Sequence, residues 1–328
     1  MEQPNEPIVL GIDLGGTKIL SAICDRQGNM MSSDQRTTPS EKGQDAVIRT
    51  MAESGYRALE KSSVDIELVA AIGVGVPGPL NSQEGILYTA PNLPDWSDVP
   101  IKSILAQVFN KKVFVINDAN AAAFAEYRFG AGRGSSYFIY ITISTGIGGG
   151  MVIDGNIYTG ASGTAAEIGH MTIDDAGPRC NCGNHGCWEA LGSGSAMARQ
   201  ARKWVAESAP TRILEYADGN AENITALTIY RAAREDDKIA ADIVAETAHY
   251  LGTGLANLIN VYNPDVIALG GGLTRMGAML LDPAYAVARK RSFKPAYQAV
   301  RIVTAELQKN SGVQGAAAYA FQQLSKSS

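Results

Sequence analysis

The hydrophobic pattern begins with two short strands on either side of a glycine turn. Ile8 to Asp13 predicts a buried strand, Gly15-Gly16-Thr17-Lys18 a turn, and Ile19 to Ile23 a second strand. A P-loop needs Gly-Lys-Ser/Thr before a helix, whereas here Gly-Thr-Lys precedes a strand. Two interpretations stay open at this point. The turn is an ordinary hairpin, or its backbone amides hold phosphate, with Asp13 close to a phosphate-bound Mg²⁺.

The same pattern returns in the middle of the chain. Tyr137 to Ile143 is a β-rich run, the segment Ser144 to Gly150 is rich in glycine, and Met151 to Ile153 is apolar again. We therefore expect a second strand, glycine turn and strand, with the turn over Ser144 to Gly150. Two copies of one unit predict two related lobes that face each other across a nucleotide.

Between and after these copies, helical and strand patterns alternate, which predicts an α/β protein. Helical spacing covers Asp45 to Leu59, Ala196 to Ala206, Ile224 to Arg234, Ile239 to Tyr262 and Gly315 to Leu324. Buried-strand patterns cover Leu68 to Val76, Lys112 to Ile116 and Asp265 to Leu269. The last of these strands runs into a third glycine turn, Gly270 to Gly272, where a ligand can approach the backbone.

Two polar positions near strand ends have a structural and a functional interpretation. Asp118 lies where a strand becomes an alanine-rich helix, so it is either the helix cap or a functional carboxylate. Asn92, in the proline-broken segment TAPNLPDW, is either an Asx-turn residue or a donor and acceptor for a polar ligand. The pattern alone does not decide between them.

Three of the four cysteines crowd into the segment Glu167 to Glu189 and predict a metal site. Cys180, Cys182 and Cys187 with His170 supply three sulfur atoms and one nitrogen, a set that suits tetrahedral Zn²⁺. We prefer His170 to His185, because a histidine inside so short a knuckle has little freedom to turn back onto the same ion. The fourth cysteine, Cys24, lies in an apolar strand pattern and is expected to be a small core residue.

Composition narrows the class of partner. The net charge is −5, without a basic run or interleaved aromatic residues, which argues against nucleic acid and anionic membranes. The start MEQPNEP has neither the basic nor the apolar region of a secretory signal, and the apolar helical stretch Ile239 to Tyr262 is interrupted by Asp242, Glu246 and His249. We therefore expect a cytoplasmic protein that binds small molecules.

Taken together, the motifs resemble the ROK family (repressors, uncharacterised open reading frames, sugar kinases). The matching motifs are GIDLGGTK from Gly11, NDANAAA from Asn117, STGIGGG from Ser144, EIGH from Glu167, CNCGNHGCWE from Cys180 and NPDVIALGGG from Asn263. The resemblance covers nearly the whole chain, in order. It implies a two-lobed actin-like, hexokinase-like (ribonuclease H-like) ATPase fold with a central cleft and a zinc knuckle.

The resemblance also implies a division into lobes. We expect residues 1–117 to form a small α/β lobe, rejoined by the C-terminal helix 315–328, and residues 118–314 to form a large lobe with the zinc loop and a dimerisation surface. Family members are sugar kinases or repressors with an N-terminal winged helix-turn-helix domain. Because the first phosphate strand begins at Ile8, we expect the kinase.

By the same resemblance the site residues take roles. Asp118 becomes the catalytic base. The sugar contacts are Gly78, Asn92, Asn117, Asp118, Glu167, His170 and Glu189. ATP and Mg²⁺ are held by Asp13, Gly15, Gly16, Thr17, Lys18, Thr145 and Gly146, with Gly270 and Gly271 near the adenosine. Zn²⁺, on His170, Cys180, Cys182 and Cys187, braces the loop so that the imidazole presents its other nitrogen to a sugar hydroxyl.

These roles predict an ATP-dependent hexose kinase. Glucose, phosphorylated at the 6-hydroxyl, is the first choice of substrate. The alternatives are N-acetylmannosamine, mannose or fructose as the substrate, polyphosphate as the donor, a sugar-sensing regulator without turnover, or a zinc-knuckle interaction module. A homodimer or a dimer of dimers is expected from the family.

Overall fold

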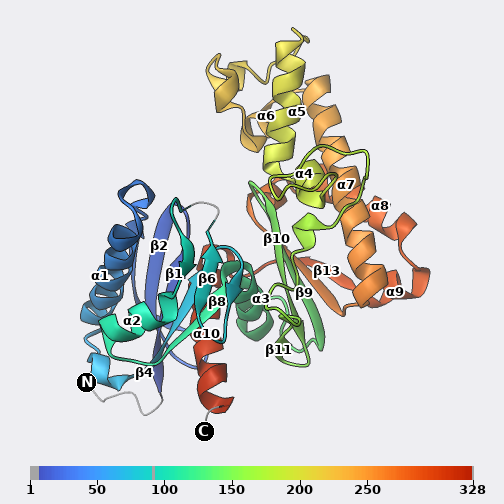
Figure 1. The fold of residues 1–328 in the computed structure, drawn as a ribbon. Coiled ribbons are helices and arrows are strands. Elements are labelled where there is room, and N and C mark those ends of the chain that lie inside the picture. The colour runs from blue at the N-terminus through green and yellow to red at the C-terminus, as the bar shows by residue number, and fades with distance from the viewer. Residues whose placement is uncertain (1–6, 91–92, 327–328) are drawn as a thin grey trace. The chain divides into compact units, whose positions relative to one another are not determined.

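In the computed structural model, which describes residues 7–90 and 93–326, the chain forms two compact units (Figure 1). Unit 1 contains residues 1–135, 150–166 and 305–328, and unit 2 contains residues 136–149 and 167–304. Residues 118–135, 150–166 and 305–314, which were expected in the second lobe, lie in unit 1. The chain therefore passes between the units at four points.

Unit 1 is built on a five-stranded sheet of order β3-β2-β1-β4-β8. Strands β1, β2 and β3 are antiparallel neighbours, while β4 is parallel to both β1 and β8. The strands are β1 (Ile8–Leu14), β2 (Lys18–Cys24), β3 (Met30–Thr37), β4 (Val69–Val76) and β8 (Val113–Asn117). The predicted strand, glycine turn and strand is thus confirmed for the first copy.

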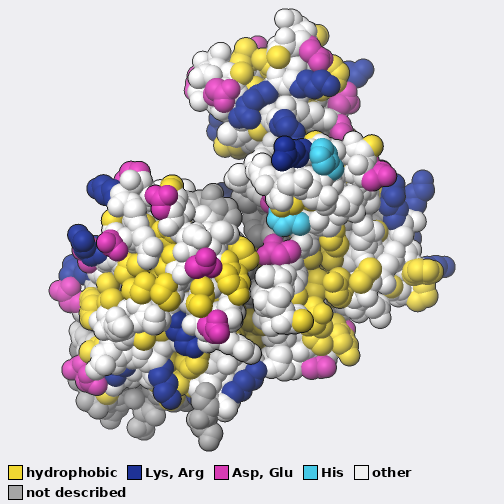
Figure 2. All heavy atoms as spheres, viewed as in Figure 1, with side chains coloured by type: hydrophobic (Ala, Val, Ile, Leu, Met, Phe, Trp, Pro, Cys, Tyr) yellow, Lys and Arg dark blue, Asp and Glu magenta, His cyan; other side chains and the backbone are white. Residues whose placement is uncertain are grey.

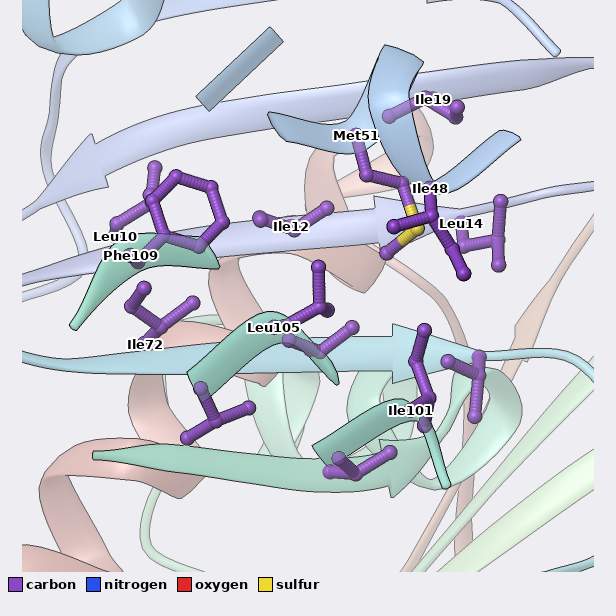
Figure 3. Packing of buried hydrophobic residues seen from close by; sticks show 14 of the residues in the cluster. Leu10, Ile12, Leu14, Ile19, Ile48, Met51, Ile72, Ile101, Leu105 and Phe109 are labelled. Carbon is purple, nitrogen blue, oxygen red and sulfur yellow. The ribbon is translucent and has the colours of Figure 1, made fainter. Parts of the chain in front are cut away.

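Helices cover both faces of this sheet. Side chains alternate between the two faces along each strand, so buried strands place apolar residues against helices on either side. Leu10, Ile12 and Leu14 of β1 belong to a core cluster with α1 (Gln44–Ser62) and α2 (Ile101–Phe109), seen from close by in Figure 3. Val9 belongs to a second cluster, with α10 (Ser311–Lys326) and the fully buried Cys24. The expectation that Cys24 is a core residue is confirmed.

Helix α10 lies directly on the strand backbones at two glycines. A Cβ atom on Gly73 would meet the carbonyl oxygen of Ala316 at 1.9 Å, and one on Gly11 would meet that of Val313 at 2.6 Å. Since real Cβ atoms do not approach so closely, both positions need glycine for space. The C-terminal helix therefore seals one face of the unit 1 sheet.

Unit 2 carries the other copy of the fold. Its sheet has the order β11-β10-β9-β12-β13, in which β12 is parallel to β9 and β13, while the short β11 is antiparallel to β10. The strands are β9 (Tyr137–Ile143), β10 (Ile147–Ile153), β11 (Asn156–Ile157), β12 (Val266–Gly270) and β13 (Arg301–Thr304). By its contacts, the part of this sheet formed by the last residues of β10 and all of β11 belongs to unit 1. The sheet repeats the strand order of unit 1, which confirms the predicted duplication.

One detail of the second copy differs from the prediction. The glycine segment was expected to be a turn as far as Gly150, but β10 begins at Ile147, so Gly148 to Gly150 are strand residues. A Cβ atom on Gly149 would lie 2.4 Å from Ile168 Cδ1. These glycines therefore make room for neighbours inside the sheet, and the turn itself is short.

The remaining elements connect and cover the two sheets. The other helices are α3 (Asp118–Phe129), α4 (Trp188–Gly192), α5 (Gly194–Ala206), α6 (Ala226–Ala233), α7 (Lys238–Tyr262), α8 (Ala278–Arg291) and α9 (Lys294–Ala299). A small sheet in unit 1 joins β5 (Leu80–Asn81), β6 (Ile86–Thr89) and β7 (Ser97–Val99). Short 3₁₀ helices lie at Ser40–Lys42, Ile66–Leu68, Ile168–His170, Glu215–Ala217, Ala221–Asn223, Gly272–Met276 and Gln308–Asn310.

The lengths of the helices and the distribution of surface charge among the described residues concern which partners the protein can bind. Within residues 7–90 and 93–326, none of the helices has the length and apolar character needed to cross a bilayer. On the face drawn in Figure 2, Lys and Arg side chains are interspersed with Asp and Glu.

Candidate functional site

The first group of predicted site residues lies in unit 1, in the turn between β1 and β2. The turn is closed by the Gly15 amide, which donates to the carbonyl oxygen of Lys18 at 2.9 Å. Thr38, a buried residue, braces it twice: its hydroxyl donates to the Gly15 carbonyl at 2.7 Å and its amide to the Thr17 carbonyl at 3.0 Å. The structure thus holds Gly15 to Lys18 in one fixed turn.

Asp13 lies at the end of β1 beside this turn. Burial raises the pKa of its carboxyl to about 6, an effect that the nearby Lys18 ammonium group reduces. A Cβ atom on Gly312, in the first turn of α10, would meet Asp13 Oδ2 at 2.5 Å, so the helix backbone packs against the carboxylate. Asp13 is therefore a poorly solvated acid next to an amide-lined turn.

The second group in unit 1 is at the start of α3. Asn117, not Asp118, is the N-cap: its side-chain oxygen accepts the amides of Ala119 and Asn120 at 3.0 and 3.1 Å. Its amide nitrogen donates to the carbonyl oxygen of Gly78 at 3.2 Å. The structure therefore brings Gly78, Asn117 and Asp118 together, and the capping interpretation of Asp118 is wrong.

Asp118 is the first residue of the helix, and its carboxylate accepts the Ala119 amide at 2.7 Å. The positive end of the helix dipole favours its negative charge. Gly78 has φ +94°, a conformation that favours glycine, at the turn after β4. Asn92, the remaining sugar contact predicted for this unit, lies outside the described residues.

Unit 2 holds the other predicted sugar contacts, Glu167, His170 and Glu189. Glu167 and His170 are joined by a 3₁₀ turn, in which the His170 amide donates to the Glu167 carbonyl at 3.0 Å. Burial raises the pKa of the Glu167 carboxyl; the charge of His170 lowers it and that of Glu189 raises it. The charges of His170 and Glu189 thus both act on the Glu167 carboxyl.

Four metal-ligand side chains meet next to these carboxylates. The ligand atoms of His170, Cys180, Cys182 and Cys187 all lie within 4.8 Å of one another. Cys182 Sγ and Cys187 Sγ are 3.7 Å apart, as are Cys180 Sγ and His170 Nδ1. In a zinc tetrahedron with bonds of about 2.3 Å, ligand atoms lie about 3.8 Å apart, whereas a disulfide needs about 2.05 Å. The set fits a tetrahedral ion, and His170 turns Nδ1 toward it.

The backbone of the cysteine loop is folded tightly around this cluster. The Cys180 amide donates to the Asn184 carbonyl at 2.7 Å, and Gly183 and Gly186 have φ of +95° and +65°. His185 is an exposed residue of the loop and is not among the four. The preference for His170 over His185 therefore agrees with the geometry.

The glycine turns of unit 2 lie beside α4 and α5. Thr145 is exposed, whereas Gly146 approaches Glu189 so closely that a Cβ atom on it would lie 2.3 Å from Glu189 Oε2. Gly271 has φ +89°, and a Cβ atom on it would lie 2.3 Å from the carbonyl oxygen of Ile143. Gly270 and Gly271 therefore lie beside the strand that leads into the Thr145 turn.

Sequence reasoning missed the residues that hold the turns in place. Thr38 braces the first turn, and the amides of Gly194 and Ser195 donate to the carbonyls of Ser144 and Thr145 at 2.8 and 3.1 Å. No short motif marks these positions, since each acts through a backbone or hydroxyl contact with a distant segment.

The chemistry available in each unit is clear from these contacts. Unit 1 offers a carboxylate at a helix start, and a second carboxylate beside a turn lined with amides. Unit 2 offers two carboxylates and an imidazole, which suit hydroxyl groups, and another glycine turn. Each unit thus has polar groups that suit a hydroxylated or phosphorylated ligand, and a carboxylate that can take a hydroxyl proton.

Comparison with known proteins identifies relatives over almost the full chain. The model of the ROK family matches residues 9–323. A glucokinase of Thermotoga maritima is 36% identical over 316 residues, which cover 94% of this chain and 96% of the relative. A xylose repressor of Caldicellulosiruptor bescii is 31% identical, over 94% of this chain and 76% of the repressor.

A solved structure shows the same fold. It is a ROK family glucokinase from Streptomyces griseus in complex with glucose and AMPPNP. The identity is 34%, the TM-score is 0.81, and the match covers 96% of this chain and 99% of that one. The expected hexokinase-like α/β fold is thereby confirmed.

Proposed function

Because this chain belongs to the ROK family, we propose that it is an ATP-dependent glucokinase. It transfers the γ-phosphoryl group of ATP to the 6-hydroxyl of glucose. Glucokinases of similar length match 94% of the chain at 36% identity, and a glucokinase with the same fold binds glucose and AMPPNP. N-acetylmannosamine, mannose and fructose remain the alternative acceptors, and polyphosphate the alternative donor.

The observation that carries the proposal is the arrangement at the start of α3. Asn117 occupies the N-cap position, and the carboxylate of Asp118 lies next to it in the first turn of the helix. We assign Asp118 as the general base, which accepts the proton of the attacking hydroxyl. One hydrogen of the Asn117 amide is used by Gly78, and the other is available for a sugar oxygen.

The other site residues bind and orient the two substrates. Glu167, Glu189 and His170 Nε2 hold the sugar hydroxyls, together with Asn92 and Gly78. The amides of Gly16, Thr17 and Lys18, in the turn that Gly15 closes, hold the phosphates together with Thr145 and Gly146, while Gly270 and Gly271 lie near the adenosine. Phosphoryl transfer needs mainly such positioning and charge neutralisation.

Two metal ions belong to the proposal. Asp13 holds the Mg²⁺ that accompanies ATP, since a cation relieves the poor solvation of its charge. Cys180, Cys182, Cys187 and His170 hold a structural Zn²⁺, which keeps the cysteine loop folded and fixes the tautomer of His170. The proposal also includes a cytoplasmic location, where ATP is available, and a homodimer or dimer of dimers, which light scattering tests.

A coupled assay of ADP release with a panel of hexoses tests this function. Glucose should give the highest kcat/KM. Asp118→Asn should reduce kcat by a factor of about 10² to 10⁴, since only the proton acceptor is removed, and Asp118→Ala should reduce kcat at least as much, since it also loses the sugar contact. Glucose binding by Asp118→Asn, measured by calorimetry, should persist.

A second candidate is a sugar-responsive regulator, favoured by the match to a xylose repressor. It predicts hexose binding without ADP release in the unaltered protein. That result would contradict the glucokinase assignment, whereas full turnover by Asp118→Asn would contradict the assignment of Asp118 as the general base.

A further inference from the structure

Glu189 contacts the phosphate-binding turn of unit 2 directly. It is the second residue of α4 and follows Cys187 of the metal cluster by two positions. Its Oε2 atom accepts the amide of Ile147 at 2.9 Å. Ile147 is the first residue of β10 and immediately follows Thr145 and Gly146. A residue assigned to the sugar thus holds the turn assigned to ATP.

Gly146 shows how close this contact is. A Cβ atom there would lie 2.3 Å from Glu189 Oε2 and 3.1 Å from Cδ. The backbone of Gly146 does not have the positive φ that side chains avoid. Glycine is therefore required at this position because the carboxylate occupies the space of a side chain.

The corner between α4 and α5 adds two backbone contacts to the same turn. The Gly194 amide donates to the Ser144 carbonyl at 2.8 Å, and the Ser195 amide donates to the Thr145 carbonyl at 3.1 Å. The segment 189–195 therefore holds Ser144, Thr145 and Ile147 by three hydrogen bonds. These hydrogen bonds tie the turn to the start of α4 and to the corner that follows it.

The two carboxylate oxygens of Glu189 differ in their contacts, one with the turn and one open to the sugar. Oε2 is committed to Ile147. Among the described residues, the structure shows no hydrogen-bond partner for Oε1. A sugar hydroxyl that binds Oε1 would fix the orientation of the whole carboxylate and, with it, the position of the Ile147 amide.

We infer that Glu189 couples the hexose site to the phosphate-binding turn, so that binding of the sugar raises the affinity for the nucleotide. The inference rests on the proposed function for the identity of the two ligands. Coupling between binding sites is reciprocal, so nucleotide must raise the affinity for sugar by the same factor. Glu189 therefore acts in two ways, as a sugar contact and as a positioning residue for the nucleotide.

The test measures four dissociation constants by calorimetry: glucose and AMPPNP, each alone and with the other ligand at saturation. In the unaltered protein we expect each ligand to strengthen the other about five- to tenfold. Gly146→Ala should push the carboxylate aside. It should weaken glucose binding about tenfold, although residue 146 is not a sugar contact, and bring the coupling factor close to 1.

Gly272→Ala is the matched control. It adds the same methyl group in the neighbouring glycine turn, where the nearest atom, Ser144 Oγ, would be 3.8 Å away. We expect its glucose affinity in the absence of nucleotide to stay within about twofold of the unaltered protein; the control uses glucose affinity alone, because Gly272 follows the two glycines assigned to the adenosine. Circular dichroism melting of both variants reports whether they fold.

A double-mutant cycle identifies the partner of Gly146. Glu189→Asp withdraws the carboxylate, so Gly146→Ala should cost much less glucose affinity in that background than in the unaltered protein. Equal costs in both backgrounds, unchanged glucose affinity in Gly146→Ala, or a coupling factor of 1 in the unaltered protein would overturn the inference. Each of these results is compatible with full kinase turnover, so the assay of ADP release separates them from failure of the proposed function.

Discussion

At the scale of single residues, Asp13 is the group whose titration has the largest consequence. Its folded pKa of about 6 lies above the ordinary value of 3.8. Below pH 3.8 both the folded and the unfolded chain are protonated, and Asp13 costs nothing. Between pH 3.8 and 6 the unfolded chain loses the proton first, so stability falls, and above pH 6 the penalty is constant.

Asp13→Asn should therefore stabilise the protein while it lowers kinase activity. At about 1.4 kcal/mol for each pKa unit, the free energy of unfolding in urea at pH 7.5 should rise by up to about 3 kcal/mol. The gain should vanish near pH 4. The exposed Asp242→Asn is the control and should change stability little at either pH. A gain that is equal at both pH values would show that desolvation is not its cause.

At the scale of elements, the cysteine loop and α4 behave as one piece. Cys187 is the N-cap of α4, and the next residue, Trp188, is fully buried. The Trp188 ring packs against Gly254 of α7, where a Cβ atom would lie 2.1 Å from the ring. A metal ion in the cluster would hold the start of this helix. Loss of the ion should therefore reach Glu189, one residue further along.

Cys182→Ser should lose zinc, because a hydroxyl group is a poor replacement for a thiolate. Metal analysis should show about one ion per chain in the unaltered protein and close to none in the variant. Glucose affinity should fall as well, by about tenfold or more, as for other losses around a metal site. Cys24→Ser should keep its zinc, since Cys24 lies in the core of unit 1. Stoichiometric zinc with full activity in Cys182→Ser would show that the ligand set is wrong.

At the scale of the whole molecule, two units repeat one sheet order, and the proposed ligand contacts come from both. Glucose that binds only the folded chain stabilises it by mass action. At a concentration one hundred times Kd, the gain is about 2.7 kcal/mol, which corresponds to a rise of roughly 4 °C in Tm for a chain of this length. Thermal melting with glucose should show this rise, and Asp118→Asn should retain it. Equal melting with and without glucose would contradict the sugar site.

Much of the fold could be predicted from the sequence, because its signals are local. Pairs of apolar runs on either side of a glycine turn predicted both copies of the repeated unit. Asn263-Pro264 predicted the end of α7 at Tyr262. The spacing of the cysteines predicted the metal cluster, since its sulfur ligands lie within eight residues of one another. The motif resemblance predicted the ROK family and the hexokinase-like fold, which the comparisons confirmed.

The tertiary structure decided what depends on contacts between distant segments. Asn117 and Asp118 are both good caps, and only the observed hydrogen bonds assign the cap to Asn117. Gly148 to Gly150 were expected to be a turn, but sheet packing makes them strand residues. Gly146 was expected in a phosphate-binding turn, and only the structure shows that Glu189, 43 positions later, occupies the place of its side chain. A sequence records which residues are present, and packing determines which of their atoms have room to meet.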